Sequence, residues 1–366
     1  MRIRFEKRAD PSQVMLYLTP VGAVLLTMIV GAIIFSVIGY NGLGAVKEVF
    51  LTPLLNPIKW QEVALKASPL ILIGVGLAAG NRAAIWNIGA EGQYVFGALA
   101  GTGVGLVTQD YTGFWILPCM LVAGFVGGAL YGAIPALLRT RFRVNETLSS
   151  LMMTYVAIHL MNYLVTGPWK DPHGYNFPQT PLLTYDQIMP TLIPGTVVHW
   201  GVAFTLIIAI IMWVVMSRSV FGFQIRVVGS APDAARYAGF SANQTVWLVF
   251  MLSGGLAGLA GIFEVTGPFQ QMSTGFPANY GFTAIIVAFL GRLNPLGVIL
   301  AGIVLAITYV GGDIAQASLG LPNASKGIFQ AMMLFFLLAS DILVRYRVRF
   351  ATRAPVVAAQ SERRAA

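Results

Sequence analysis

Charged side chains are scarce in this sequence. Asp, Glu, Lys and Arg make up 10% of its 366 residues, against roughly 25% in an ordinary soluble domain. Apolar residues, counting Tyr and Cys, make up 57%. So few charges cannot cover a surface that faces water. The composition therefore excludes a soluble globular protein and predicts one embedded in lipid.

Cysteine, histidine and catalytic motifs are also sparse. The single cysteine, Cys119, excludes an intramolecular disulfide, and the three histidines lack the spacing of a metal site. We expect Cys119 to be a small buried core residue. Neither an H-E-x-x-H nor a G-x-S-x-G motif occurs, so we expect no catalytic residue and no metal. The phosphate loop G-x-x-x-x-G-K-[ST] is missing too, so any ATP that drives this chain must be split by another.

Long apolar segments alternate with short polar connections. A helix needs about 20 apolar residues to cross a bilayer. On this rule the sequence predicts an all-α polytopic membrane protein with about ten transmembrane helices, near residues 14–40, 63–79, 93–108, 113–137, 147–165, 199–216, 245–265, 281–291, 295–312 and 327–344. The segment 281–291 reaches only about 16 Å, half of the hydrocarbon core. We therefore expect it to be short or broken.

The basic residues indicate an orientation. With the N-terminus inside, 18 of the 23 Lys and Arg residues lie on the inner side and 5 on the outer side. The positive-inside rule then predicts that both termini are cytoplasmic. This topology also explains the net charge of +9 better than nucleic-acid binding does.

Three regions follow from this topology. We expect a cytoplasmic N-terminus (1–13), a single transmembrane domain (14–345) and a basic cytoplasmic tail (346–366) that is disordered from Ala351. The external loop 166–198 is rich in proline, so it cannot form a regular helix. A partner that docks there and a rigid connector are both compatible with the sequence.

A short likeness connects the two halves of the chain. Residues 87–89 (NIG) and 279–281 (NYG) each precede an apolar run. An offset of five helices would invert the second copy, and inverted repeats with broken helices are typical of transporters. The match is only a few residues long, so a chance likeness stays open.

The inner loop 217–243 contains a helix signal of its own. Ser230 is placed to cap a helix, Pro232 suits its first turn, and Asp233 completes a capping-box-like pattern. Gly239 can end the helix in the left-handed conformation. A helix of about seven residues is marginal alone in water, so we expect it to dock on another protein. An ordinary loop packed on its own bundle is the alternative.

This loop resembles the coupling segment of permease subunits in ABC importers, in the family that serves simple sugars, branched-chain amino acids and nucleosides. Further segments are similar to the nucleoside-importer branch: 86–93 (WNIGAEGQ), 144–152 (VNETLSSLM), 257–261 (AGLAG), 281–283 (GFT) and 291–297 (GRLNPLG). The resemblance runs from about residue 14 to residue 345.

The resemblance implies a permease subunit that has no enzymatic activity and works as one half of a permease pair, usually of two different subunits. Its implied partners are a cytoplasmic ATPase that holds ATP and Mg, the second permease, and an external lipoprotein that captures the substrate. The implied location is the bacterial cytoplasmic (inner) membrane. Nucleosides are the first substrate class, and other purine-like or sugar-containing solutes stay open. The ATPase contact would fall on Ser230, Pro232, Asp233, Ala234, Ala235, Arg236, Tyr237 and Gly239.

Polar residues at or within the span ends are candidates for the substrate pathway, because charges in apolar surroundings are costly and usually functional. Amides and carboxylates supply donors and acceptors for a neutral polar solute, and aromatic rings can stack on a nucleobase. The candidates are Asn87, Glu91, Gln93, Asn145, Glu146, Glu264, Tyr280 and Phe282.

Structural roles are the alternative for several of these residues. Glu91 and Glu146 lie near helix N-termini, where the helix dipole stabilises a carboxylate. Aromatic residues at span ends often form the interfacial belt. Glu264 follows a Gly-rich stretch deep in a predicted span, where a pathway role and a structural pairing are both open.

The leading interpretation is an ATP-driven importer subunit, with substrate passing between two permease chains by alternating access. An ion-coupled secondary transporter in which a carboxylate carries the proton is the alternative. Lipid offers no hydrogen bonds to polar side chains, so we expect a neighbouring permease to bury Asn87, Glu91, Asn145 and Glu264. A glycine series allows close helix approach, within the chain or between chains: Gly254, Gly255, Gly258 and Gly261.

Overall fold

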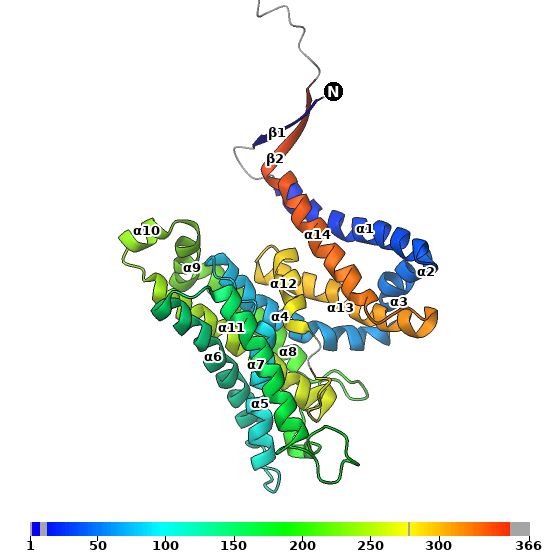
Figure 1. Cartoon of the computed structure of the whole chain (residues 1–366), viewed down its shortest axis with the longest axis vertical. Coiled ribbons are helices and arrows are strands. Elements are labelled where there is room, and N and C mark those ends of the chain that lie inside the picture. The colour runs from blue at the N-terminus through cyan, green and yellow to red at the C-terminus, as the bar shows by residue number, and fades with distance from the viewer. Residues whose placement is uncertain (1, 8–12, 277–278, 352–366) are drawn as a thin grey trace, which may run out of the picture. The chain divides into compact units, whose positions relative to one another are not determined.

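The computed structural model describes residues 2–7, 13–276 and 279–351. The described elements are helical apart from one pair of strands. In chain order (Figure 1) they are β1 Arg2–Lys7, α1 Gln13–Val37, α2 Gly42–Val46, η1 Lys47–Leu51, α3 Thr52–Leu55, α4 Lys59–Arg82, α5 Ala90–Val107, α6 Ile116–Phe142, α7 Glu146–Thr166, η2 Tyr185–Gln187, α8 Trp200–Arg218, α9 Val220–Ser230, α10 Pro232–Tyr237, α11 Ala242–Glu264, η3 Val265–Phe269, α12 Tyr280–Leu290, α13 Pro295–Leu319, α14 Ser325–Arg345 and β2 Tyr346–Ala351.

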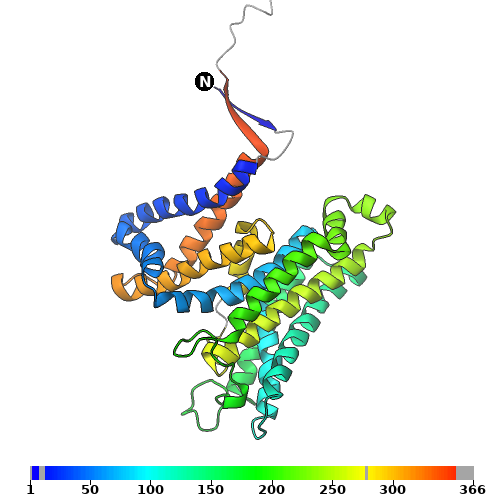
Figure 2. The ribbon, with the colours of Figure 1, turned by 180° about the vertical axis from the view of Figure 1, so that it is seen from behind.

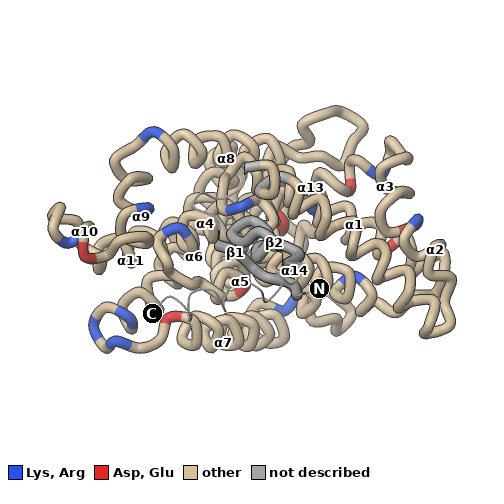
Figure 3. The backbone as a smooth tube through the Cα atoms, turned by 90° about the horizontal axis from the view of Figure 1, so that it is seen from above, with Lys and Arg blue, Asp and Glu red and all other residues tan. Residues whose placement is uncertain are grey.

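Each of the ten predicted segments coincides with a helix. Within the described residues, seven helices are long and apolar enough to cross a membrane: α1, α4, α6, α7, α8, α11 with η3, and α13. The helix at 281–291 is short, as predicted, since α12 has 11 residues. In Figure 3 most of the backbone is uncharged, with few and separated charged positions. The crossing of α5, α12 and α14 stays a prediction.

The chain divides into two units, Met1–Gly42 with Ala331–Ala366, and Leu43–Gln330. In the first unit β1 pairs antiparallel with β2, with Arg2 opposite Ala351 and Lys7 opposite Tyr346. The sequence analysis missed this pairing, although both segments alternate polar and apolar residues at a strand period. The pairing places residues 2–7 beside residues 346–351, and the cytoplasmic location of both termini stays a prediction. The expected disorder beyond Ala351 lies outside the described residues.

In the second unit, helices of one half of the chain pack on helices of the other half, in a pattern that supports the internal repeat. Helix α11 packs mainly on α6 and α5, whereas α4 packs mainly on α13, α11 and α12. Each central helix, α4 and α11, therefore lies against the helices of the other half. Figures 1 and 2 both show α5, α6, α7 and α11 running side by side. This is the arrangement expected when α4–α7 and α11–α14 correspond.

Glycines let α11 approach its neighbours at backbone distance. A Cβ at Gly258 would lie 2.3 Å from the Gly124 carbonyl oxygen of α6, and one at Gly128 would lie 2.2 Å from the Gly254 carbonyl oxygen. Any larger side chain would force the helices apart. Of the two open uses of the glycine series, packing within the chain is the one seen here.

The chain also buries most of its own polar interior. Asn87 is 4% exposed, Glu91 0% and Glu264 3%. The expectation that a neighbouring permease is needed to bury them is therefore wrong, because the helices of this unit enclose them. Asn145 is exposed. The expectation for Cys119 is also wrong: the thiol is exposed on α6, which is tolerated because an apolar side chain in lipid need not be buried.

The external loop follows an irregular path that hydrogen bonds fix in place. Its backbone amides at Thr180, Leu183 and Met189 donate to Met272, Gln270 and Thr266 in the segment after α11. At its end His199 caps α8, because its Nδ1 accepts from the Gly201 amide at 3.1 Å.

The predicted topology places exposed His173 on the outer side. We expect His173→Cys, in a Cys119→Ser background, to react with an impermeant thiol reagent in intact cells, after outer-membrane permeabilisation where one exists. The background substitution is needed because Cys119 is exposed. Cys119→Ser alone is the control and should stay unlabelled. Labelling only after lysis would reverse the orientation of every span.

Candidate functional site

Two helices extend the inner loop between α8 and α11. Helix α9 is joined to α10 through Ala231, and Figure 1 shows both at the far ends of α8 and α11. Ala235 anchors α10, being 2% exposed, whereas Tyr237 is 98% exposed. Pro232, Asp233, Ala234 and Arg236 are also exposed. The short helix predicted in this loop is confirmed, and most of its surface is available to a partner.

The start of α10 differs from the prediction. Ser230 belongs to the last turn of α9, where its hydroxyl donates to the Arg226 carbonyl oxygen at 2.7 Å. The N-cap of α10 is Ala231, without a side-chain cap, so the predicted capping by Ser230 is wrong. A second helix directly before α10 uses this serine for its own end. Gly239 follows the helix with φ 81°, as predicted for a left-handed stop.

Asn145 and Glu146 lie at the start of α7, next to the end of α6. The Asn145 side chain accepts from the amides of Thr147 and Leu148 and so caps α7. Glu146 pairs with Arg139 at 2.7 Å. These contacts are the structural roles weighed as the alternative for this helix end. A pathway role for either residue stays a prediction.

Asn87 and Gln93 form a closed polar network before and within the first turn of α5. Asn87 Nδ2 donates to Gln93 Oε1 at 2.8 Å and to Ser253 Oγ at 3.1 Å. In return Gln93 Nε2 donates to Asn87 Oδ1 at 3.2 Å. The two amides satisfy each other and connect α5 to α11. Their geometry leaves little hydrogen-bonding capacity for a solute.

Glu91 reaches from the first turn of α5 to the start of α12. Its Oε1 accepts from the Asn279 amide at 3.0 Å, and its Oε2 accepts from the Gly281 amide at 2.5 Å. The carboxylate thus takes the place of an N-cap for a helix of the other half of the chain. Phe282, the next residue of α12, is half-buried.

Five aromatic residues gather beside this helix start; we call them the aromatic cluster: Tyr94, Phe269, Phe276, Tyr280 and Tyr309. Tyr94 stacks on Phe276 with ring centroids 5.1 Å apart and planes at 7°. Tyr280 meets Tyr94 and Tyr309 edge-on, at 6.1 and 5.4 Å. The cluster joins α5, α12 and α13 with the segment between α11 and α12. Tyr94, Phe276 and Tyr280 are each 0% exposed, so other parts of the protein cover these rings in this structure.

Glu264 is a buried carboxylate of this region that has no hydrogen bond among the described residues. It lies at the end of α11, is 3% exposed, and receives no hydrogen bond from any residue that the structure describes. Its electrostatic partner is Lys66 on α4, whose Nζ lies 5.6 Å from the centroid of the Tyr280 ring. A buried carboxylate without hydrogen bonds is costly. A pathway role for Glu264 and a structural pairing with Lys66 both stay predictions.

Unsatisfied polar atoms continue from Glu264 into the aromatic cluster. The hydroxyl oxygens of Tyr94 and Tyr280 are buried, with no hydrogen-bond partner among the described residues. Gln330 also keeps an unsatisfied Nε2, while its Oε1 accepts from Thr283 at 3.3 Å. Buried polar groups in proteins are normally paired. We take Glu264, Lys66 and the aromatic cluster as the candidate site, because they combine free donors and acceptors with ring faces.

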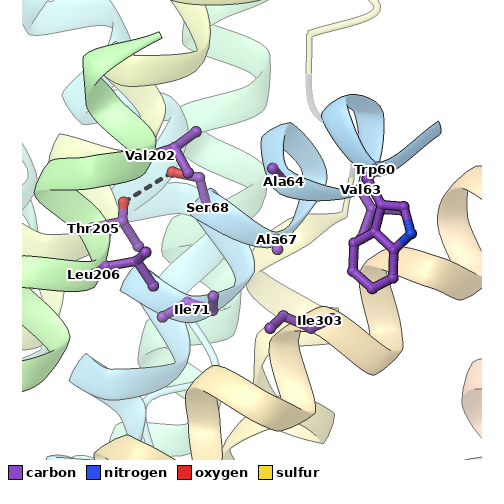
Figure 4. Close-up of a pocket in the computed structure, with 10 residues that line it drawn as sticks. All are labelled: Trp60, Val63, Ala64, Ala67, Ser68, Ile71, Val202, Thr205, Leu206 and Ile303. Carbon is purple, nitrogen blue, oxygen red and sulfur yellow. Dashed lines mark hydrogen bonds between the residues drawn. The ribbon is translucent and has the colours of Figure 1, made fainter. Parts of the chain in front are cut away.

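A separate cavity of ≈ 130 Å³ opens between α4, α8 and α13 (Figure 4). Its lining is apolar apart from Ser68 and Thr205, whose hydroxyls are hydrogen-bonded to each other at 2.8 Å. A polar solute would lose its hydration there without gaining new hydrogen bonds. This cavity therefore does not match the chemistry of the candidate site.

Sequence reasoning found part of this site. Glu264 and Tyr280 were among the candidates and lie together. Tyr94, Phe276, Tyr309 and Lys66 were missed. Nothing in the local sequence of the three aromatic residues differs from that of an ordinary helix or loop. One signal was available for Lys66: a lysine in the second turn of a helix long and apolar enough to cross a membrane is itself a functional indication.

The comparisons with known proteins agree with this architecture. Residues 60–338 match the family described as "Branched-chain amino acid transport system / permease component". The chain is 37% identical to the glucose ABC transporter permease protein TsgB13 of Haloferax volcanii, over 92% of this chain and 90% of that protein. It is 30% identical to the guanosine ABC transporter permease protein NupP of Bacillus subtilis, over 91% and 94%.

A third relative, the nucleoside ABC transporter permease protein NupB of Lactococcus lactis, is 26% identical over 89% of this chain and 92% of that protein. These matches decide against the alternative of an ion-coupled secondary transporter. The protein is therefore a member of the branched-chain amino acid transport system permease family, and it is a transmembrane permease subunit of an ABC transporter and not itself an enzyme.

Proposed function

We propose that this permease carries a nucleoside or a closely related purine-containing solute past Glu264 and the aromatic cluster. The observation that carries the proposal is the buried carboxylate of Glu264, which receives no hydrogen bond from the described residues. It lies near aromatic rings on which a planar base can stack. Burying a charged group without hydrogen bonds is costly, and in membrane proteins such groups usually have a function, here the binding of the solute.

The chemistry of a nucleoside fits both the aromatic rings and the polar groups of the site. Stacking of a base on an aromatic side chain contributes about 1–3 kcal/mol. A carboxylate can accept two parallel N–H donors from the edge of a purine. The tyrosine hydroxyls and the Gln330 amide can bind the hydroxyls of the sugar.

A sugar is the second candidate. It is favoured by the 37% identical relative, whose name specifies glucose. Aromatic rings and a carboxylate also suit the apolar faces and vicinal hydroxyls of a hexose. Only the base distinguishes the two ligands, so transport of guanosine and of glucose by the same preparation separates them.

The partners belong to the proposal as well. We expect a cytoplasmic ATPase that binds ATP and Mg, a second permease chain and an external substrate-binding lipoprotein, all in a bacterial cytoplasmic membrane. The sequence leaves open whether the two permeases are copies of one chain. The exposed face of α10 supports this helix as the ATPase contact, because a six-residue helix is not stable without support.

The coupling role of α10 can be tested by changing its exposed end. Arg236→Glu with Gly239→Val should leave the protein in the membrane but weaken capture of the ATPase and lower ATP-driven uptake by about tenfold or more. Both changes alter a surface proposed to meet the ATPase. Lys170→Glu, a charge reversal in the external loop, is the matched control. Unchanged uptake and ATPase capture would remove α10 from the mechanism.

The substrate role of Glu264 can be tested in vesicles that contain the permease pair, the ATPase and the binding protein. Glu264→Gln should preserve assembly and lower ATP-driven guanosine uptake by about tenfold, because the neutral amide is a weaker acceptor. Glu62→Gln, at a partly exposed ion pair with Lys59, is the control. Normal uptake by Glu264→Leu would contradict the role. ATP-driven glucose uptake without guanosine uptake would favour the sugar.

A further inference from the structure

Glu91 is a buried carboxylate whose position is accounted for by contacts within the chain, without a bound solute. It is 0% exposed, and its oxygens accept the Asn279 and Gly281 amides at 3.0 and 2.5 Å. Two backbone donors at the start of one helix therefore converge on a side chain from another.

The start of α12 depends on this contact. Asn279, the N-cap residue, is left-handed with φ 59° and makes no side-chain cap. The first amides of a helix need acceptors, and the positive end of its dipole favours an anion. Glu91, on α5, supplies both the acceptor and the negative charge, although it lies 190 positions before Gly281 in the chain.

Backbone packing strengthens the same joint. A Cβ built on Gly281 would lie 2.3 Å from the Glu91 amide nitrogen. Only glycine allows α12 to start this close to α5. The carboxylate cap and the glycine contact thus hold the two helix starts against each other.

Tyr280 lies between the two residues that Glu91 holds. Its backbone is flanked by the Asn279 and Gly281 amides, and its ring contacts Tyr94, Tyr309 and Lys66. A shift of the start of α12 would therefore move the Tyr280 ring within the candidate site. Glu264, by contrast, lies on α11 and has no hydrogen bond to α12 among the described residues.

We propose that Glu91 is a positioning residue: it caps α12 from α5, fixes the Tyr280 ring in the substrate pathway, and does not itself bind the solute. The part that concerns the substrate rests on the proposed function. The cap itself does not, since it follows from contacts within the chain.

Glu91→Gln is the isosteric test. The amide of glutamine keeps one acceptor but turns a donor toward a backbone N–H, so one of the two bonds is lost. In the assembled importer in nanodiscs, hydrogen exchange at residues 279–283 should be faster by about tenfold. Uptake of guanosine or glucose, whichever the wild type carries, should fall by a similar factor. Glu62→Gln is the matched control and should change neither.

A double-mutant cycle separates positioning from a general loss of stability. If Glu91 acts through Tyr280, then Tyr280→Leu should already remove most of its effect on uptake, and Glu91→Gln should add little to it. Losses that multiply would overturn the proposal. So would exchange at residues 279–283 that matches the wild type in Glu91→Gln.

Gly281→Ala gives a second route should Glu91→Gln fail to assemble. It keeps the carboxylate but presses a Cβ against the backbone of Glu91. Faster exchange at residues 279–283 and the same lack of additivity with Tyr280→Leu would support the proposal, and wild-type exchange would contradict it. Faster exchange in a protein that carries neither guanosine nor glucose would uphold the cap while rejecting the proposed substrate.

Discussion

Lipid offers no hydrogen bonds, so each helix start in the apolar part of this chain needs a partner from the protein itself. The joint between α5 and α12 meets this demand with one carboxylate, Glu91, and one glycine, Gly281. Because α4 and α11 each pack on helices of the other half, the joint lies where the two halves of the chain cross. The position of the candidate site follows from this crossing.

The same demand separates structural polar residues from functional ones. Asn87 and Gln93 hydrogen-bond to each other. Asn145 accepts a hydrogen bond from an amide at the start of α7. Glu264 receives no hydrogen bond from the described residues, and the buried hydroxyls of Tyr94 and Tyr280 have no partner among them either. A polar solute that passes between the helices can supply the missing bonds for a short time. Such a site favours passage, because full satisfaction in the resting chain would leave nothing for the solute to replace.

The sequence predicted the helices well and the contacts between them poorly. The apolar segments and the shortness of α12 can be predicted from the local sequence, since hydropathy and the positions of proline and glycine determine structure over a few residues. The α10 helix was predicted for the same reason, but its capping was not, because α9 lies directly before it. Tyr94, Phe276 and Lys66 come together only through the packing of α4, α5 and the segment before α12. Cys119 was misplaced because burial rules from water do not hold for a lipid-facing helix.

The central claim is that a solute passes the aromatic cluster at the crossing of the two halves. Its most direct test is a single cysteine at Tyr280, in a Cys119→Ser background, within the assembled importer in vesicles. The account predicts that a small hydrophilic thiol reagent modifies this cysteine during ATP turnover, and that guanosine delivered by the binding protein slows the modification. A cysteine that stays unmodified in every state of the transport cycle would contradict the account.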